Sequence, residues 1–302
     1  MIEGARPSQC GYVAILGAPN VGKSTLVNYL VGAKVSIVTP KVQTTRTRVL
    51  GICIAGASQI VFVDTPGIFA PRRRLDRAMV AAAWSGAADA DLVAVLVDSA
   101  KGIDGDTRRI LERLADSKRN AVLVLNKIDR VKKPALLALA TEAAATARFA
   151  ETFMISALNG DGVGAVKTYF ASAVPEGPWL FPEDQISDMP LRLLAAEVTR
   201  EKVFLELRQE LPYAATVETE RWQERGDGSV RIEQVIFVER NSQKGIVLGK
   251  GGQRVKAIGA ESRRELEELF ERRVHLFLFV KVRERWGDDP ERYREWGLDF
   301  NA

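Results

Sequence analysis

The feature that most limits the fold is a series of short, unbroken apolar runs separated by segments with helical periodicity. The runs YVAIL, IVFVDT, LVAVLVD, AVLVLNKID and TFMISAL fall between Tyr12 and about Phe170. Stretches of Val, Ile and Leu without alternation are typical of strands buried on both faces of a parallel sheet. Helices are expected between them, over 23–32, 104–116, 134–148 and 163–173. The pattern predicts a doubly wound α/β fold.

The rest of the chain predicts a hairpin, a linker and a second domain. A turn at 56–58 between two apolar runs indicates a hairpin that adds one antiparallel edge strand. The segment 174–190 contains four prolines and no sustained period, as expected of a linker. Beyond it the expected order is α-β-β-α-α-β. A chain of 302 residues favours two domains. We expect these at 1–175 and 191–285, joined by the linker 176–190 and followed by a tail at 286–302.

The stretch GAPNVGKST follows the first apolar run and opens a helix, which is the context of a phosphate-binding loop. Glycines let backbone N–H groups close around phosphates, Lys23 reaches the β and γ oxygens, and the Ser24 hydroxyl can hold Mg²⁺. The predicted phosphate-binding residues are Gly17, Ala18, Pro19, Asn20, Val21, Gly22, Lys23, Ser24 and Thr25.

The tetrapeptide NKID, about one hundred residues further on, indicates which base is bound. It ends a strand, where open α/β sheets bind ligands. The Asp129 carboxylate can accept hydrogen bonds from guanine N1–H and N2–H₂, whereas adenine has no N2 amine. Asn126 would brace the loop, Lys127 would lie along the base, and SAL at 156–158 would close over it. The predicted guanine-binding residues are Asn126, Lys127, Ile128, Asp129, Ser156, Ala157 and Leu158.

Two further segments predict a nucleotide-dependent switch. In DTPG, Asp64 can approach the Mg²⁺ shell and the Gly67 N–H can meet the γ-phosphate; Thr65 and Pro66 lie between them. In the polar loop SIVTPKVQTTRTR, either Thr44 or Thr45 would ligate Mg²⁺ when the γ-phosphate is present, and we favour Thr45. Ile68 stands where many small GTPases have a water-orienting glutamine. No side chain is an obvious catalytic base, so unassisted hydrolysis should be slow, on the order of 10⁻² s⁻¹ or less.

The second domain has a neutral composition with one basic island. Residues 190–302 contain 21 Lys and Arg and 21 Asp and Glu, which excludes a uniformly basic RNA-binding domain. From 240 to 260 there are five basic residues and no acidic ones, around the sequence GKGG. A G-x-x-G between two helices is how KH modules clamp about four nucleotides, although a plain helix–helix turn remains an alternative. The predicted RNA-binding residues are Lys244, Gly249, Lys250, Gly251, Gly252, Arg254 and Lys256.

The last predicted strand, VHLFLFVKV, alternates two apolar faces. One face, with Phe277 and Phe279, could stack RNA bases or pack on the tail that contains Trp286, Tyr293 and Trp296. We expect packing on the tail, because apolar stripes usually belong to a core. We interpret His275 as structural for the same reason.

GAPNVGKS, QTTRTR, DTPG, NKID and SAL in this order, followed by a GKGG-bearing domain, closely resemble the Era family of bacterial GTPases over nearly the whole chain. The resemblance implies a P-loop GTPase domain with a C-terminal type II KH domain and GTP, GDP and Mg²⁺ as ligands. It further implies binding to single-stranded RNA near the 3′ end of small-subunit rRNA, a role in assembling the small ribosomal subunit, and peripheral contact with the inner membrane. Relatives with Asn at the position of Asn20 can use K⁺ near the phosphates, so the resemblance makes K⁺ a candidate cofactor here.

Two other functions stay open from the sequence alone. In the first, the chain is a signalling GTPase whose second domain binds protein or anionic membrane. The second is ATP-driven phosphotransfer, which would require adenine preference and a substrate pocket. The two cysteines, Cys10 and Cys53, have no metal-ligand spacing and fit a reducing compartment, so we expect a cytoplasmic location. We also expect a monomer.

Overall fold

The computed structural model describes residues 8–117, 119 and 121–302. Its contacts divide the chain into two compact units, which we describe separately. The first contains the described residues up to Ser36, together with Thr45–Asp188 and Tyr293–Ala302. The second contains Met189–Arg292 and the short segment Ile37–Thr44. Within the described residues, no helix is both long and apolar enough to cross a membrane.

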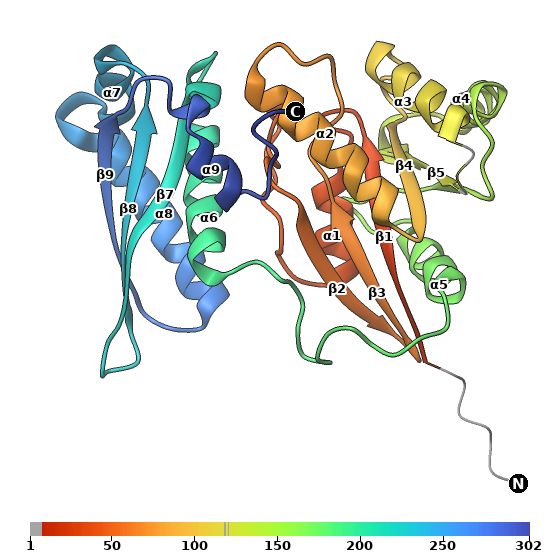
Figure 1. Cartoon of the computed structure of the whole chain (residues 1–302), viewed down its shortest axis with the longest axis horizontal. Helices are drawn as coiled ribbons and strands as arrows, with labels where there is room; N and C mark the ends of the chain where they lie inside the picture. The colour runs from red at the N-terminus through yellow and green to blue at the C-terminus, as the bar shows by residue number, and fades with distance from the viewer. Residues whose placement is uncertain (1–7, 118, 120) are drawn as a thin grey trace, which may run out of the picture. The chain divides into compact units, whose positions relative to one another are not determined.

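The first unit is built on a mostly parallel six-stranded sheet (Figure 1). Its strand order is β2-β3-β1-β4-β5-β6, and only the β2–β3 hairpin pairs antiparallel. The sheet therefore confirms the predicted doubly wound fold with one antiparallel edge strand. The strands are β1 (Gln9–Gly17), β2 (Val49–Ala55), β3 (Ser58–Asp64), β4 (Leu92–Asp98), β5 (Ala121–Asn126) and β6 (Thr152–Met154).

Five helices and one 3₁₀ turn are described in this unit. They are α1 (Lys23–Val31), α2 (Arg74–Asp89), α3 (Gly105–Ser117), η1 (Ile128–Arg130), α4 (Lys133–Thr146) and α5 (Val163–Ala173). Four of them lie where helices were expected, and α2 was not predicted. Its buried residues include Leu75 and Met79 in the first half but Ala83, Gly86 and Ala87 in the second, so large buried apolar residues mark a helical period only over its start.

The proline-rich segment packs as an additional strap on the first unit. The Gln59 side chain of β3 accepts hydrogen bonds from the backbone N–H groups of Leu180 and Phe181 at 2.9 and 3.0 Å. Trp179 Nε1 donates to the Ala57 carbonyl oxygen at 3.1 Å. Much of the expected linker is therefore held against the hairpin edge of the sheet.

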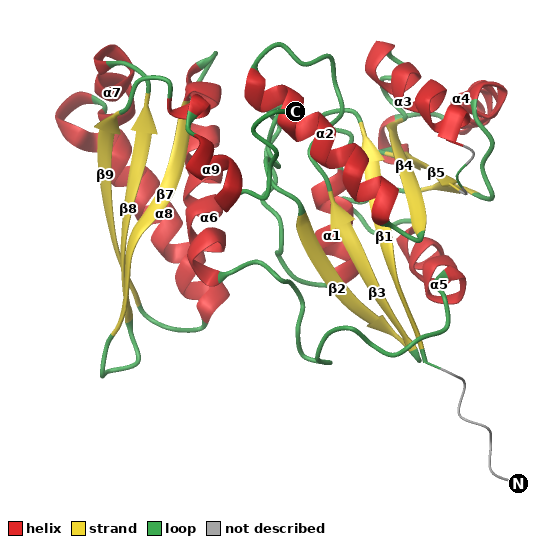
Figure 2. Cartoon of the chain, viewed as in Figure 1, coloured by secondary structure: helices red, strands yellow, loops and turns green. Residues whose placement is uncertain are grey.

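The second unit has the predicted α-β-β-α-α-β order (Figure 2). Helices α6 and α8 pack together against a three-stranded sheet of order β7-β8-β9, in which β8 pairs antiparallel with β7 and parallel with β9. Buried side chains of the sheet and of both helices form its core. The elements are α6 (Leu191–Glu206), η2 (Leu211–Ala214), β7 (Ala215–Glu224), β8 (Val230–Val238), α7 (Asn241–Leu248), η3 (Lys250–Gly252), α8 (Gln253–Phe270), β9 (Val274–Val282) and η4 (Trp286–Asp288), and a further helix, α9 (Pro290–Glu295), follows.

One sequence-based expectation about β9 is wrong. Phe277 and Phe279 were expected to pack on the tail, yet they are 42% and 48% exposed. Trp286 does not cover them, because it is buried and its Nε1 donates to the Ala214 carbonyl oxygen at 2.9 Å. The alternation of apolar residues correctly predicted a strand but could not show which face another element would cover.

Candidate nucleotide and RNA sites

The predicted phosphate loop joins β1 to α1 and has the backbone that its glycines allow. Gly22 has φ 101°, and a Cβ atom there would overlap the side-chain amide of Asn126. A side chain at this position is therefore excluded by both conformation and space. The parallel register aligns Ile15 of β1 with Asp64 of β3, and Asp98 of β4 with Asn126 of β5. The predicted motifs thus meet at the carboxyl edge of the sheet.

Lys23 is buried inside the loop that it serves. Its ammonium group donates to the carbonyl oxygens of Gly17 at 3.2 Å and Ala18 at 3.1 Å. Burial lowers the pKa of Lys23 to about 8, and the neighbouring Asp64 partly opposes this shift. A phosphate group in the loop would replace the carbonyl partners with a full negative charge.

Three hydroxyl groups surround the carboxylate of Asp64. Its Oδ2 accepts from Ser24 at 2.7 Å, from Ser36 at 2.6 Å and from Thr45 at 3.3 Å. Burial raises the pKa of Asp64, and these hydrogen bonds together with Lys23 oppose that effect. Asp64 Oδ1 is buried and has no hydrogen-bond partner in the described part of the chain. Hydroxyl and carboxylate oxygens beside an orphan oxygen fit a hydrated Mg²⁺.

The two candidate threonines of the switch loop point to different places. Thr45 Oγ1 lies 2.9 Å from Ser24 Oγ, inside the oxygen cluster. Thr44 Oγ1 instead hydrogen-bonds within its own loop, to Thr39 Oγ1 at 2.7 Å and the Lys41 carbonyl oxygen at 2.8 Å. This geometry favours Thr45 as the Mg²⁺ ligand.

The DTPG segment lies against the phosphate loop. A Cβ atom on Gly67 would come within 2.9 Å of Pro19 Cα, so the two backbones touch. The Thr65 hydroxyl donates to the Ile15 carbonyl oxygen at 2.7 Å and faces the sheet. Ile68 is buried in the core, and its N–H donates to the Gly17 carbonyl oxygen at 3.1 Å. Its side chain therefore cannot orient an attacking water.

Asn126 joins three loops of the nucleotide site. Its amide nitrogen donates to the Val21 carbonyl oxygen at 2.8 Å, and its Oδ1 accepts from the N–H groups of Lys127 at 2.8 Å and Ala157 at 2.9 Å. Lys127 has φ 65°, and its ammonium donates to the Asn20 carbonyl oxygen and to Asp98 Oδ2, both at 2.7 Å. These contacts agree with the predicted bracing role of Asn126.

Asp129 differs from Asn126 in being free of structural contacts. It lies in η1, is exposed, and has no hydrogen-bond or ion-pair partner among the described residues. Its carboxylate is therefore available to a ligand. The Ser156 backbone is fixed by the Asp161 carbonyl oxygen at 2.9 Å, while the Leu158 side chain is exposed. Ile128 is held through its N–H, which donates to the Ile155 carbonyl oxygen at 3.2 Å.

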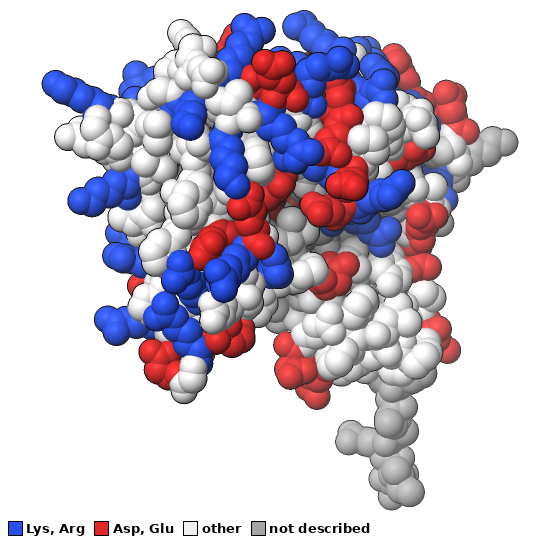
Figure 3. Space-filling view, turned by 60° about the vertical axis from the view of Figure 1, so that its left-hand side comes forward, with Lys and Arg blue, Asp and Glu red and all other residues white. Residues whose placement is uncertain are grey.

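The predicted RNA-binding loop lies between α7 and α8. Gly249, Gly251 and Gly252 have φ 71°, 60° and 78°, so this tight turn depends on residues without a Cβ atom. The side chains of Lys250 and Lys256 are exposed, and Lys244 is half-buried. Acidic and basic side chains are interspersed on the face shown in Figure 3, in keeping with the balanced charge of 190–302.

Arg254 has a structural contact beside its predicted RNA role. Its guanidinium donates to the Ile246 carbonyl oxygen and thereby ties α8 to the end of α7 across the glycine loop. Ile246 and Arg254 also line a pocket of about 450 Å³ together with residues 206–211. Ile246 is half exposed, which leaves an apolar surface next to the loop on which a base can lie.

Two residues of the nucleotide site were missed by sequence reasoning. Asp98 ends an apolar strand, and that position was a usable signal. Ser36 had no comparable sequence signal, because an isolated serine between apolar residues is common. Its contact with Asp64 joins positions 28 residues apart, which no local pattern indicates.

Comparison with known proteins identifies a GTPase domain and a KH domain in the chain. The model of the family described as "50S ribosome-binding GTPase" matches residues 12–127, and that of the KH domain matches 210–287. GTPase Era of Rhizobium meliloti is 64% identical over 297 residues, covering 98% of this chain and 95% of that protein. GTPase Era of Brucella suis is 63% identical, with 98% and 95% covered.

Two solved structures are also similar over almost the full length. One is Era in complex with MgGDPNP and nucleotides 1506–1542 of 16S ribosomal RNA, and the other is a point variant of Aquifex aeolicus Era bound to GDP·AlF4⁻. Each aligns with a TM-score of 0.91 at 40% identity, covering 96% of this chain and 99% of the other.

Proposed function

This chain belongs to the Era family of GTPases, and from that premise we propose that it uses GTP binding and hydrolysis to control its binding of ribosomal RNA. The RNA is single-stranded and lies near the 3′ end of the small-subunit rRNA, and the cellular role is assembly of the small ribosomal subunit. The relative that carries nucleotides 1506–1542 of 16S rRNA supports this target.

The observation that carries the proposal is that two adjacent residues, Thr44 and Thr45, are held by different units of the chain. The Thr45 hydroxyl belongs to the oxygen cluster around Asp64, in the first unit. The Thr44 carbonyl oxygen accepts from the buried guanidinium of Arg200 on α6, in the second unit. Two adjacent residues are thus held by the magnesium site and by the KH domain. A change in how Thr45 is held is transmitted through the backbone to α6.

Further contacts attach the switch segment 37–44 to α6. The Val38 N–H donates to Glu201 Oε1 at 2.8 Å. The Lys41 ammonium donates to the carbonyl oxygens of Phe204 and Leu207 at the end of α6. A cation at this position complements the negative end of the helix dipole. The segment therefore caps α6, and its release would remove these hydrogen bonds to the end of the helix.

In the nucleotide site each residue has a separate task. The loop N–H groups and Lys23 bind the phosphates, and Asp129 selects guanine through its free carboxylate. Ser24 and Thr45 would hold Mg²⁺ directly, with Asp64 bound to its water shell; the ion neutralises charge on the phosphates. Because Ile68 cannot orient water, hydrolysis depends on backbone groups, ions or a partner.

Potassium is one such ion, with Asn20 as the residue that would approach it. Its backbone has φ 62°, and its carbonyl oxygen is fixed by Lys127. We expect faster GTP turnover in KCl than in NaCl. Equal turnover in the two salts would remove potassium from the mechanism. The monomeric state, the cytoplasmic location and the peripheral membrane contact stay predictions.

RNA binding and GTP hydrolysis by the full chain test the proposal together. Wild-type protein should bind a fluorescent RNA equivalent to 1506–1542 of 16S rRNA, and Lys250→Ala should weaken that binding without changing GTP affinity. Binding to anionic vesicles that needs no RNA and is lost on Lys250→Glu would instead support a membrane-directed signalling GTPase. Undiminished RNA binding by Lys250→Ala would contradict the role of the glycine loop.

A further inference from the structure

A cluster of arginines surrounds the start of α2, with Arg72 and Arg73 before the helix and Arg74 and Arg77 on it, and Arg113 lies on the neighbouring α3. None of Arg72, Arg73, Arg74 and Arg113 has an Asp or Glu side chain within ion-pair distance in the described structure, and Arg77 Nε meets only the Ala302 carbonyl oxygen at 3.4 Å. Arginines at nine other positions form ion pairs with a carboxylate, whereas others, such as Arg130 and Arg148, form none in the described structure; the paired ones are Arg108, Arg109, Arg200, Arg221, Arg231, Arg272, Arg283, Arg285 and Arg292.

The acidic residue within this cluster does not neutralise it at the surface. Asp76 is only 4% exposed, and its Oδ2 accepts from the backbone N–H groups of Arg72 at 3.0 Å and Arg73 at 2.9 Å. Its charge therefore serves the start of α2, while the guanidinium groups of Arg72 and Arg73 extend from exposed residues. Cations at the start of a helix also oppose the helix dipole. Arg74 has a structural contact, since its guanidinium lies 4.3 Å from the centre of the Phe300 ring, whereas no ring or carboxylate contacts the guanidinium groups of Arg72 and Arg73 in the described structure.

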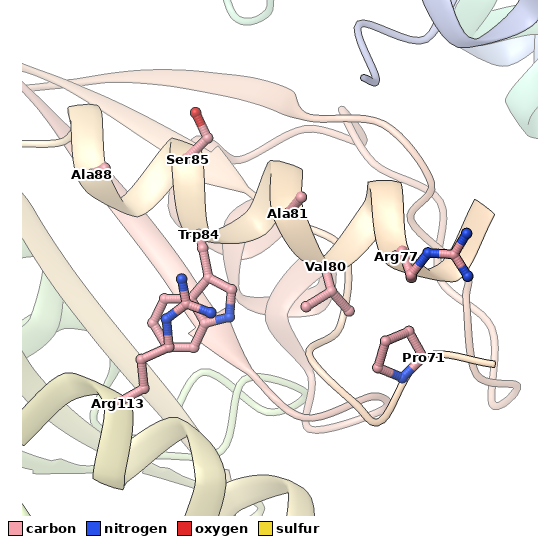
Figure 4. A pocket seen from close by; sticks show the side chains of 8 residues that line it. All are labelled: Pro71, Arg77, Val80, Ala81, Trp84, Ser85, Ala88 and Arg113. Carbon is pink, nitrogen blue, oxygen red and sulfur yellow. The ribbon is translucent and has the colours of Figure 1, made fainter. Parts of the chain in front are cut away.

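A groove of about 470 Å³ runs from this cluster along α2 to α3 (Figure 4). Its wall is one stripe of α2, with Arg77, Ala81, Trp84 and Ala88, and Arg113 comes from α3. The Arg113 guanidinium lies 4.3 Å from the centre of the half-buried Trp84 ring. Figure 4 shows this pair at one end of the groove and Arg77 with Pro71 at the other. The groove thus has cations at both ends and a flat aromatic surface inside.

From these features we infer that the α2–α3 groove is a second RNA-binding surface, which holds the phosphodiester backbone of a segment other than the one at the glycine loop. Arginine is suited to this role because its planar fork pairs with phosphate and stacks on aromatic rings and bases. The Trp84–Arg113 pair offers a stacking surface for a base, as in proteins that bind single-stranded nucleic acid. Unpaired cations also mark the glycine loop, where Lys250 and Lys256 have no carboxylate partner in the described residues. This inference rests on the RNA-binding function proposed above.

The test compares two RNAs on the full chain loaded with a non-hydrolysable GTP analogue. The long RNA corresponds to nucleotides 1506–1542 of 16S rRNA. The short one is a single strand of about four nucleotides, which a KH loop alone can hold. The variant is Arg72→Gln/Arg77→Gln/Arg113→Gln, which includes both arginines that line the groove. The matched control, Arg108→Gln/Arg109→Gln, removes arginines of α3 that are paired with Glu142 and Asp106.

We expect the triple variant to bind the long RNA about tenfold more weakly and to reduce the salt dependence of its binding, by about 0.7 in the log–log slope for each phosphate that loses its arginine. Its affinity for the short RNA and its melting temperature should not fall, and the control should behave as wild type. If the triple variant binds the long RNA as tightly as wild type does, the inference is overturned. If wild type binds poly-glutamate through the groove instead of RNA, the groove is assigned to an acidic protein segment. Lys250→Ala leaves the groove intact, so the binding of both RNAs by this variant tests the proposed function separately from the groove.

Discussion

Replacing Asn126 by alanine should destabilise the protein even when no nucleotide is bound. The side chain is 2% exposed and makes three hydrogen bonds, to Val21, Lys127 and Ala157. Its removal leaves two N–H groups and one carbonyl oxygen unpaired in a buried place. At about 1 kcal/mol for each bond, the free energy of unfolding should fall by about 3 kcal/mol. Asn126→Asp keeps the acceptor for both N–H groups, so it should lose less.

The comparison variant is Asp129→Ala, in the same motif. Asp129 is exposed and has no partner in the described structure, so its removal should leave the apo protein as stable as wild type. It should nevertheless weaken GDP binding roughly hundredfold, because two hydrogen bonds to a charged acceptor are lost. Urea unfolding of the apo protein and calorimetric titration with GDP measure the two effects. The reasoning would be refuted if Asn126→Ala had the same free energy of unfolding as wild type, or if Asp129→Ala lowered it as much as Asn126→Ala does.

Three further predictions follow from the site. Burial lowers the pKa of Lys23 to about 8 in the free protein, so phosphate binding above pH 8 must take up a proton. GTP affinity, measured by calorimetry, should therefore fall by up to about tenfold per pH unit between pH 8 and pH 10. An affinity that does not change with pH over this range would contradict the prediction. Thr45→Ala should raise the Mg²⁺ concentration needed for GTP hydrolysis, whereas Thr44→Ala should not; the reverse result would exchange their roles. Gly251→Ala, at φ 60°, should weaken binding of RNA measured by anisotropy but leave GTP affinity unchanged; RNA affinity equal to that of wild type would show that the turn tolerates a side chain.

The strands and the nucleotide motifs could be predicted from the sequence because their signals are local. An apolar run such as LVAVLVD determines a buried strand by itself, and a glycine loop between a strand and a helix determines a phosphate site. Asp64, Asn126 and Lys23 were found because each sits at a fixed place in such a motif. Local signals also indicated the α-β-β-α-α-β order of the second domain.

The features that the sequence did not reveal depend on contacts between distant segments. Ser36 joins the Asp64 cluster only because the fold brings its loop to the end of β3. Phe277 and Phe279 have the alternation of core residues, yet both side chains are substantially exposed. The sequence could not decide between Thr44 and Thr45, because adjacent threonines have the same local sequence. The decision depends on which hydroxyl faces Ser24.

The attachment of segment 37–44 to α6 was equally hidden. Its basis is a set of backbone contacts, from Arg200 to the Thr44 carbonyl oxygen and from the Val38 N–H to Glu201. Backbone groups are the same at every position, so no residue pattern in the loop indicates them. This attachment nevertheless carries the proposed link between nucleotide and RNA.

The most direct test of that link is the RNA affinity of the full chain with a non-hydrolysable GTP analogue and with GDP, in wild type and in Lys41→Ala. We predict affinities that differ about fivefold or more between the two nucleotides in wild type. In Lys41→Ala, which loses the hydrogen bonds to the end of α6, the two affinities should approach one another while GTP binding stays intact. Equal RNA affinities in the wild type would contradict the account.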